Sequence, residues 1–332
     1  MQKHNELSYR LGRRPGRQGP RPQLGDQGWV EKWNTGKQEG KDTSFAMMKE
    51  TIRIGTWNVR TLREAGKLER LKVELAPYRC DILGIAEMHW TGSGELNGSE
   101  VIWNGEENNH IRGVGLLLSK RAKNALLGYY LVNARIIAAR FRGKPLNLSV
   151  IQVYVPTSDS TDEECEIFYE QLEKTLRQLP KKDVKLIIGD WNAKVGTDRS
   201  GWEQIMGRYG YGQRNERGER LLEFAAANRM IICNTRFQQK ECHKWTWMAP
   251  DGKHTNMIDM VLIDQRWKTA VRNCRTYQGA DIESDHNLVM CSVKLRLKSG
   301  KQTNRNALNR NIEALKNESI LATYQNNLQK GL

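Results

Sequence analysis

The chain has 332 residues, of which 53 are Lys or Arg and 38 are Asp or Glu, giving a formal net charge of +15. No window of about 18 apolar residues occurs, and the arginine-rich first thirty residues have no apolar core, so we expect neither a membrane span nor a secretory signal. The six cysteines stand singly, without the paired spacing of a zinc site, so we expect reduced thiols in a nuclear or cytoplasmic protein that is not secreted. The positive excess favours a polyanionic partner, with nucleic acid as the first candidate.

Composition divides the chain into three segments. Residues 1–48 are rich in Gly, Arg and Gln and have almost no apolar periodicity, which predicts a disordered basic segment. Residues 51–297 carry regularly spaced apolar clusters and are numerous enough for one large core. Residues 298–332 form a polar basic tail in which the spacing from Ile312 to Leu328 predicts a marginal amphipathic helix. More than half of the positive excess lies outside the central segment.

In the central segment, short runs rich in β-branched residues predict buried or half-buried strands. In chain order they are Ile52–Trp57, Ile82–Ala86, Val114–Leu118, Leu146–Val155, Val184–Ile188, Met257–Ile263 and Leu288–Leu295. Helical spacing appears at Leu68–Leu75, at Glu164–Leu179 after a cap at Ser160 or Thr161, and at Arg217–Asn228. Strands outnumber helices, and several neighbouring strands have no helix between them. We therefore predict an α/β fold, a two-sheet sandwich with outer helices, and not a regular βαβ barrel.

Polar residues stand at the ends of these strands. Asn58 ends the first and Glu87 the second, and Asp190 and Asn192 follow Leu186–Gly189. In addition, Asp259 lies within a strand, and Asp285 and His286 directly precede the last one. A single Asp after a strand is ordinarily a turn or cap residue. Repeated cases in one domain indicate a site, because a buried acid is costly unless it is paired or binds a cation.

This set is what metal-assisted hydrolysis of a phosphodiester requires. Glu87, with Asp285 or Asn58, offers hard oxygen ligands that are too few for a closed cage, which suits Mg²⁺, with Mn²⁺ as the alternative ion. His286 can contact a phosphate oxygen while Asp259 holds its imidazole. Asp190 can activate a water molecule, with Asn192 on the scissile phosphate. The GxSxG, HExxH and GxxxxGK[ST] patterns are all absent.

The motifs also occur in a familiar order. Together they resemble the endonuclease/exonuclease/phosphatase superfamily, and more narrowly the endonuclease domain of non-LTR (LINE) retrotransposons, in the group that includes craniofacial development protein 2. The resemblance covers residues 51–297. It rests on Thr56-Trp57-Asn58, Glu87, Tyr154-Val155-Pro156, Gly189-Asp190-Trp191-Asn192, Ile258-Asp259 and Ser284-Asp285-His286.

The resemblance implies a role for each matching residue. Glu87 would be the principal metal ligand, with Asn58 and Asp285 close to the metal, and Asp190 would activate water. His286 would pair with Asp259, while Tyr154 and Asn192 would contact the phosphate. Spacing alone does not select Tyr154, which could equally be a core aromatic. The implied activity is a Mg²⁺-dependent DNA endonuclease that nicks one strand and leaves a 5′-phosphate and a 3′-hydroxyl.

Three further residues are candidates for substrate binding. Thr246, between Trp245 and Trp247, matches a threonine used near the phosphate in related endonucleases, although a plain strand threonine is the alternative. Asn256 follows a hairpin loop at Pro250–Lys253 and stands where abasic-site enzymes carry a bulky aromatic, which argues against abasic-site specificity. Arg214 belongs to a basic group that would line a DNA channel, unless it is a solvated face: Lys194, Arg199, Arg208, Arg214, Arg217 and Arg220.

Two other functions remain open at this point. One is a superfamily phosphatase or phosphodiesterase that acts on a small phosphoester with the same metal site. The other is a domesticated nucleic-acid-binding protein that keeps the fold without catalysis. For the DNA endonuclease we expect DNA as partner, no membrane, no organic cofactor and a monomer. Because the tail resembles the linker that precedes a reverse transcriptase, we also expect a solo or fragmentary endonuclease.

Overall fold

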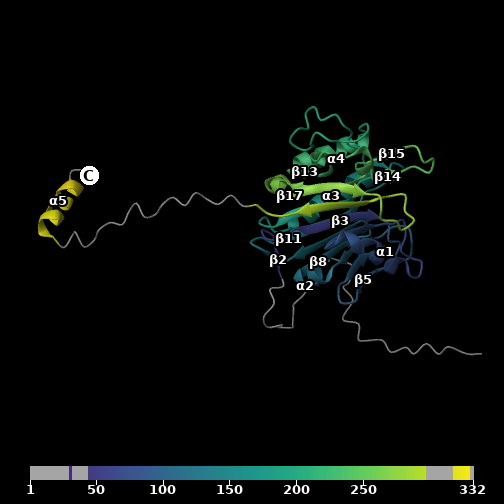
Figure 1. Ribbon diagram of the computed structural model, residues 1–332, viewed down its shortest axis with the longest axis horizontal. Helices are drawn as coiled ribbons and strands as arrows, with labels where there is room; N and C mark the ends of the chain where they lie inside the picture. The colour runs from purple at the N-terminus through teal and green to yellow at the C-terminus, as the bar shows by residue number, and fades with distance from the viewer. Residues whose placement is uncertain (1–29, 32–43, 297–316, 330–332) are drawn as a thin grey trace, which may run out of the picture. The chain divides into compact units, whose positions relative to one another are not determined.

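The computed structural model describes residues 30–31, 44–296 and 317–329. Contacts divide the chain into two units, Met1–Arg296 and Leu297–Leu332, and each is described by itself. The first unit is built from two stacked sheets with helices outside them (Figure 1). This confirms the predicted two-sheet α/β sandwich.

Each of the two large sheets has seven strands and one parallel pair. The first sheet has the order β1-β8-β9-β11-β12-β16-β13, with β11 parallel to β12. The second has the order β17-β18-β3-β4-β7-β6-β5, with β3 parallel to β4. The strands of the first are β1 (Val30–Glu31), β8 (Leu126–Asn133), β9 (Ile136–Phe141), β11 (Leu148–Tyr154), β12 (Val184–Asp190), β13 (Met230–Ile232) and β16 (Asp259–Asp264). Those of the second are β3 (Ile52–Asn58), β4 (Ile82–Ala86), β5 (Ser93–Leu96), β6 (Val101–Asn104), β7 (Val114–Leu118), β17 (Val271–Tyr277) and β18 (Leu288–Val293).

Four short strands and the helices complete the first unit. The strands form two small ladders, β2 (Phe45–Ala46) with β10 (Gly143–Lys144) and β14 (Trp247–Met248) with β15 (Thr255–Asn256). Parallel neighbours need a crossover, and helices supply it: α1 (Lys67–Leu75) joins β3 to β4 and α3 (Asp162–Gln178) joins β11 to β12. The remaining elements are α2 (Lys120–Ala125), α4 (Glu216–Ala227) and the 3₁₀ turns η1 (Ala76–Tyr78), η2 (Asn234–Arg236), η3 (Glu241–His243) and η4 (Gln265–Ala270).

Side-chain alternation along the strands produces three apolar layers. Between the sheets, Ile54 of β3 belongs to the same cluster as Val150 of β11 and Ile188 of β12. Outside the first sheet, neighbouring positions such as Ile151 and Ile187 form a second cluster with residues of α3 and α4. Outside the second sheet, a third cluster contains Trp57 and Leu83 with α1. The strand ends are thereby held at fixed positions on a continuous core.

The predicted elements occur at the predicted places, with small changes at their ends. Ile82–Ala86 and Val114–Leu118 have the predicted bounds, and the cap of α3 is Thr161, whose hydroxyl accepts from the Glu164 N–H at 3.2 Å. The predicted strand at Leu288–Leu295 ends two residues earlier, at Val293. The hairpin β8–β9, the edge strands β5 and β17, and β6 next to β5 are absent from the prediction.

The predicted boundary at residue 48 is wrong. Phe45 and Met47 are fully buried in the core, the Phe45 ring packs 6.1 Å from that of Phe141, and the Met47 carbonyl accepts from the Leu295 N–H at 2.8 Å. In addition, β1 pairs with β8. The domain therefore takes in residues from the segment expected to be disordered, whose other residues lie outside the described part of the chain.

The second unit contains the helix α5 (Glu318–Gln329). Its large apolar side chains, Ile320, Leu321, Tyr324 and Leu328, are exposed within that unit. The prediction began this helix at Ile312, and residues 312–316 lie outside those described. Across the described ranges, no helix combines the length and apolar character needed to span a membrane.

Candidate functional site

The sheet topology brings the predicted polar residues to one end of the sandwich. Asp190 is paired in register with Tyr154 on one side and with Asp259 on the other. In the second sheet, Asn58 is opposite Ala86, directly before Glu87. The β14–β15 hairpin is attached next to them, because the Met248 N–H donates to the Asp285 carbonyl at 3.0 Å. The ends of both sheets thus surround one cavity.

The cavity has a volume of about 470 Å³. Six of the eleven candidate residues line it: Glu87, Asp190, Asn192, Asn256, Asp285 and His286. The other candidates are not among its lining residues: Asn58, Tyr154, Thr246, Asp259 and Arg214. The first four of these contact the lining residues or their backbone from behind, and Arg214 lies apart.

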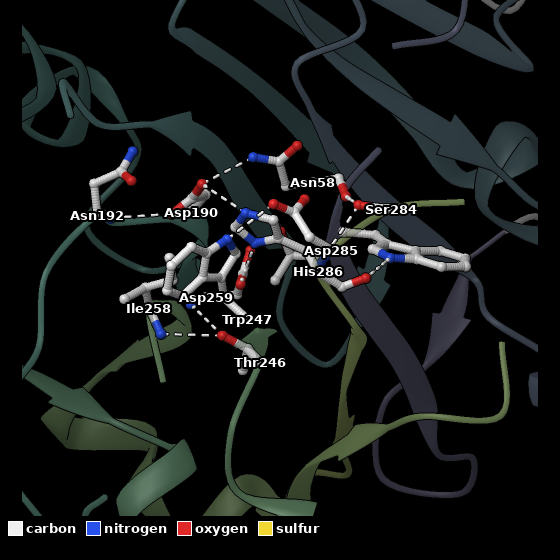
Figure 2. Close-up of polar contacts among 12 residues, drawn as sticks. Asn58, Asp190, Asn192, Thr246, Trp247, Ile258, Asp259, Ser284, Asp285 and His286 are labelled. Carbon is white, nitrogen blue, oxygen red and sulfur yellow. Dashed lines mark hydrogen bonds and ion pairs between the residues drawn. The ribbon is translucent and has the colours of Figure 1, made fainter. Parts of the chain in front are cut away.

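His286 is held by a buried carboxylate. Its Nδ1 lies 2.8 Å from Asp259 Oδ2, and both side chains are almost completely buried (Figure 2). Its Nε2 lies 3.9 Å from Asp190 Oδ2. Since Asp259 occupies Nδ1, the other ring nitrogen faces Asp190 and the cavity. The predicted pairing of His286 with Asp259 is present in the structure.

The electrostatics of this group favour a proton on the imidazole. Burial lowers the pKa of His286, but the charge and hydrogen bond of Asp259, with further charge from Asp190 and Asp285, outweigh it and raise the pKa to about 9. Burial and the charge of Asp259 raise the pKa of Asp190 to about 7, against the opposing influence of His286 and Asn58. Near neutral pH, His286 can therefore donate a proton or hydrogen bond, while Asp190 can accept a proton.

Thr246 anchors Asp259 and does not reach the cavity. Its hydroxyl oxygen accepts from the backbone N–H groups of Ile258 and Asp259, each at 3.0 Å, and the residue is fully buried (Figure 2). The prediction that Thr246 binds substrate is therefore wrong. The hydroxyl instead fixes the start of β16, from which Asp259 projects.

Asn58 connects the two sheets by its amide nitrogen. Nδ2 donates to Glu87 Oε1 at 2.8 Å and to Asp190 Oδ2 at 2.9 Å, while Oδ1 accepts from the Arg60 N–H at 3.0 Å. In this arrangement Asn58 holds the two carboxylates in place, and its role as a metal ligand stays a prediction.

Glu87 and Asp285 are the residues that fit a hard cation. Both line the cavity, and Asp285 Oδ1 is a buried acceptor with no hydrogen-bond donor. Asp285 Oδ2 accepts from the indole N–H of Trp247 at 3.0 Å, which orients the carboxylate. A second possible ligand group, Asp190, Asp259 and His286, has ligand atoms within 4.8 Å of one another. Its histidine is already bonded through Nδ1 to Asp259, so Glu87 and Asp285 are the better candidates for holding a hard divalent cation.

Asn192 and Tyr154 differ in their access to the cavity. Asn192 lines it with a left-handed backbone (φ 46°), donating its N–H to Asp190 Oδ1 at 3.0 Å and its Nδ2 to the Val155 carbonyl at 2.8 Å. The hydroxyl of Tyr154 is hydrogen-bonded to Glu87, and burial raises its pKa far above the ordinary value. In this structure Tyr154 supports Glu87 from behind the cavity.

The sequence Gly189–Trp191 explains how Asp190 is presented. Gly189 has φ 154°, and a Cβ there would lie 2.0 Å from the Val153 carbonyl oxygen, so only glycine fits. Trp191 is fully buried and donates its indole N–H to the Met260 carbonyl at 3.1 Å. As predicted, this tryptophan packs beneath the site.

Several lining residues were missed by the sequence analysis, and two of them contact Asp285. Trp247 lines the cavity and donates its indole N–H to Asp285. Arg60 also lines the cavity, with its Nε 3.7 Å from Asp285 Oδ1. Its position two residues after Asn58 was the signal available in the sequence.

The basic group predicted to form a channel is divided in the structure. Lys194 lines the cavity. Arg214 instead donates to the Val195 and Asp198 carbonyls and to Glu219, so its prediction as a substrate contact is wrong. Arg217 and Arg220 form ion pairs with Asp162 and Glu166. Guanidinium groups committed in this way stabilise the loop and the helices α3 and α4 instead of facing substrate.

Comparisons with known proteins agree with this geometry. Residues 148–290 match a family model described as Endonuclease-reverse transcriptase. The chain is 43% identical over 290 residues to craniofacial development protein 2 of Bos taurus, which covers 87% of this chain and 48% of that protein. It is 45% identical over 266 residues to the protein of the same name from Tragulus javanicus, which covers 80% and 46%. The chain thus spans about half the length of the curated relatives it matches.

Solved structures share the fold at low sequence identity. The endonuclease domain of TRAS1, a telomere-specific non-LTR retrotransposon, is 16% identical with a TM-score of 0.53, covering 75% of this chain and all of that one. The 3′-5′ exonuclease NExo from Neisseria meningitidis is 18% identical with a TM-score of 0.56, covering 74% and 100%. These matches show that the chain has the fold of endonuclease/exonuclease/phosphatase proteins and that its sequence is similar to that of craniofacial development protein 2.

Proposed function

We propose that the domain is a divalent-metal-dependent endonuclease that nicks one strand of DNA by hydrolysis of a phosphodiester. The observation that carries the proposal is the convergence of the Asp259–His286 pair, Asp190 and Glu87 on one cavity. An acid, a base and an oxygen-rich cation site are the components of a phosphodiesterase.

The protonation states of His286 and Asp190 determine their proposed roles. His286, protonated near neutral pH, donates from Nε2 to a non-bridging phosphate oxygen as negative charge develops there. Asp190, with a pKa of about 7, takes the proton of the attacking water. Asn192 is placed beside Asp190 to orient the phosphate through the amide atoms left free by the bond to Val155.

Glu87 and Asp285 would hold Mg²⁺, or Mn²⁺, at the cavity. A bound divalent cation supplies Lewis-acid stabilisation of the charge on the phosphate and the leaving oxygen. Asn58 keeps Glu87 and Asp190 in register from opposite sheets, and Trp247 orients Asp285. The proposed products are a 5′-phosphate and a 3′-hydroxyl.

DNA is supported as substrate by charge and by relatives. The chain carries a formal net charge of +15, and Lys194 and Arg60 bring cations to the cavity itself. Among the structural neighbours, NExo has also been solved bound to a product DNA hairpin, and another neighbour is an AP endonuclease from Archaeoglobus fulgidus. The similarity to the TRAS1 domain favours internal cutting.

The decisive assay is nicking of a supercoiled plasmid by the purified chain with Mg²⁺ and with EDTA. We expect nicking that requires Mg²⁺ and is abolished by Glu87→Ala and by His286→Ala. His243→Ala serves as a matched histidine variant, because His243 does not line the cavity. Absence of Mg²⁺-dependent nicking, or variants at Glu87 and His286 that nick like the parent, would refute the proposal.

The same preparation separates the nuclease from a phosphatase. NExo is described both as an exonuclease and as a 3′ phosphatase. An oligonucleotide with a 3′-phosphate and a small phosphoester are therefore incubated beside the plasmid. Faster release of phosphate from either of these than nicking of the plasmid would assign the site to end processing or to a small substrate.

A further inference from the structure

A second basic cavity lies at the edge of the first sheet. It has a volume of about 320 Å³ and lies between the loop at 199–209, η2 and η4. It shares no lining residue with the catalytic cavity. Four of its lining residues are cations and one is an acid: Arg199, Arg208, Arg236, Lys268 and Glu203.

The cations of this second cavity have no carboxylate partner among the described residues. This distinguishes Arg199 and Arg208 from Arg214, Arg217 and Arg220 of the same sequence region, each of which forms an ion pair. A guanidinium N–H of Arg236 donates to the Lys268 carbonyl, which holds η2 and η4 together. Four cations against the single carboxylate of Glu203 around one hollow create a positive potential that suits an anion with several charges.

The loop that carries these cations is fixed to the sheet edge. The Gly207 N–H donates to the Thr235 hydroxyl at 2.7 Å, and the Tyr209 N–H donates to the Thr235 carbonyl at 2.8 Å. The Ile232 N–H donates to the Ile205 carbonyl at 3.0 Å. A Cβ at Gly207 would lie 2.2 Å from the Thr235 carbonyl oxygen, so glycine permits this approach. Because the backbone is already in place, little ordering cost opposes binding.

The second cavity is within reach of a duplex bound at the first. Lys194 lines the catalytic cavity and Arg199 lines the second one. Five residues of extended chain span at most about 18 Å between their Cα atoms. One helical turn of B-DNA extends about 34 Å. One turn of duplex is therefore longer than the separation of these two positions.

We propose that the second cavity binds backbone phosphates of the DNA whose phosphodiester lies at the catalytic cavity, away from the bond that is cut. The choice of DNA as ligand rests on the proposed function. Phosphate contacts of this kind are independent of base sequence, and they appear as a dependence of affinity on salt concentration.

The test measures the affinity of the full chain for a duplex of about 20 base pairs, two helical turns, by fluorescence anisotropy in EDTA across a salt series. The variant is Arg208→Ala/Lys268→Ala, since both side chains are exposed and neither holds the fold. The control is Lys181→Ala/Lys182→Ala, which removes the same charge from the exposed turn after α3. Thermal melts verify that all three proteins are folded.

We expect the slope of log affinity against log salt to become shallower by about 1.8 in the variant, because each lost phosphate contact contributes about 0.9. The control keeps the parent slope. A variant slope equal to that of the parent, an equal change in the control, or a parent that does not bind the duplex would overturn the inference. Binding of inorganic tripolyphosphate is measured with the same proteins. If the variant loses tripolyphosphate binding but binds the duplex like the parent, the inference is also overturned.

These outcomes are independent of catalysis. A shallower slope in the variant, combined with a parent that nicks no plasmid, would support the second cavity while refuting the proposed endonuclease. Conversely, Mg²⁺-dependent nicking with an unchanged slope would keep the endonuclease and refute the second cavity.

Discussion

The substitution Asp259→Asn tests whether a buried carboxylate keeps His286 protonated. The change is nearly isosteric and leaves the backbone N–H of residue 259 bonded to Thr246. Burial lowers the pKa of His286, and Asp259 contributes the largest of the effects that raise it to about 9. Without that charge we expect the pKa to return to about 6.5 or below, since burial then outweighs the more distant acids.

The expected change is large enough to measure directly. At pH 8 the protonated fraction of His286 falls from about nine tenths to about 3%, a factor of about 30, when the pKa moves from about 9 to about 6.5. The position of the imidazole Cε1–H resonance against pH gives the pKa. The alkaline limb of the rate profile for nicking should move to lower pH by a similar amount.

Asp183→Asn is the matched control. Asp183 is another buried acid of the first sheet, bonded to Arg140 at 2.6 Å far from the cavity. Its neutralisation should destabilise the protein without changing the pKa of His286. Half a pKa unit corresponds to about 0.7 kcal/mol. If the pKa of His286 in Asp259→Asn differs from that of the parent by less than this, the electrostatic account of this pair is refuted.

Three further predictions concern stability. Thr246→Ala leaves the N–H groups of Ile258 and Asp259 unpaired, at a cost of about 1–3 kcal/mol each. Urea denaturation should show this loss in the free energy of unfolding. Thr197→Ala, at an exposed position, is the control and should show no such loss. Gly189→Ala should cost more than about 4 kcal/mol, because the Cβ collides with the Val153 carbonyl; Gly66→Ala, with open space around the Cβ, is the control, and equal melting temperatures would contradict the prediction. Because the folded pKa of His286 lies above its ordinary value, the stability it contributes is complete below about pH 6.5 and is lost as pH rises through about 9. The denaturant midpoint of the parent should therefore decrease as pH rises from 7 to 9, and that of His286→Gln should decrease less.

The polar cluster at the cavity could be predicted from sequence because each member stands beside an apolar strand. Asp190, Asp285 and His286 are polar residues at positions where a strand pattern begins or ends, and burial makes such residues conspicuous. The same patterns predicted the two sheets. The β8–β9 hairpin was missed because Gly128, Asn133 and two arginines interrupt the apolar residues of Leu126–Phe141, so that no short β-branched run stands out.

The roles of Asn58 and Thr246 could not be predicted in this way. The contact that Asn58 makes through its amide depends on Asp190, which is 132 residues away in sequence. Thr246 is buried only because the β14 hairpin is attached to the segment before β18, where the Asn287 N–H donates to the Thr246 carbonyl at 2.7 Å. Both depend on contacts between segments whose pairing the local pattern does not specify.

Burial of Phe45 and Met47 has the same explanation. Two apolar residues inside a polar stretch produce no periodic signal, so composition assigned them to the disordered segment. They become part of the core through Phe141 and Leu295, which lie about a hundred and about 250 residues further along the chain. Domain boundaries based on composition are therefore least reliable where the first residues pack against late ones.

The place of β18 in the second sheet has a consequence for the order of events during synthesis. This strand lies between β17 and β3. The first strand of that sheet, β3, therefore cannot pair on this side until β18, the last strand, has been synthesised. Contacts of such long sequence separation form slowly. His286 and Asp285 directly precede β18, and the ribosome delivers them more than two hundred residues after Asn58. A nascent chain therefore has no assembled cavity, with its histidine and its carboxylates in place, until the domain is almost entirely translated.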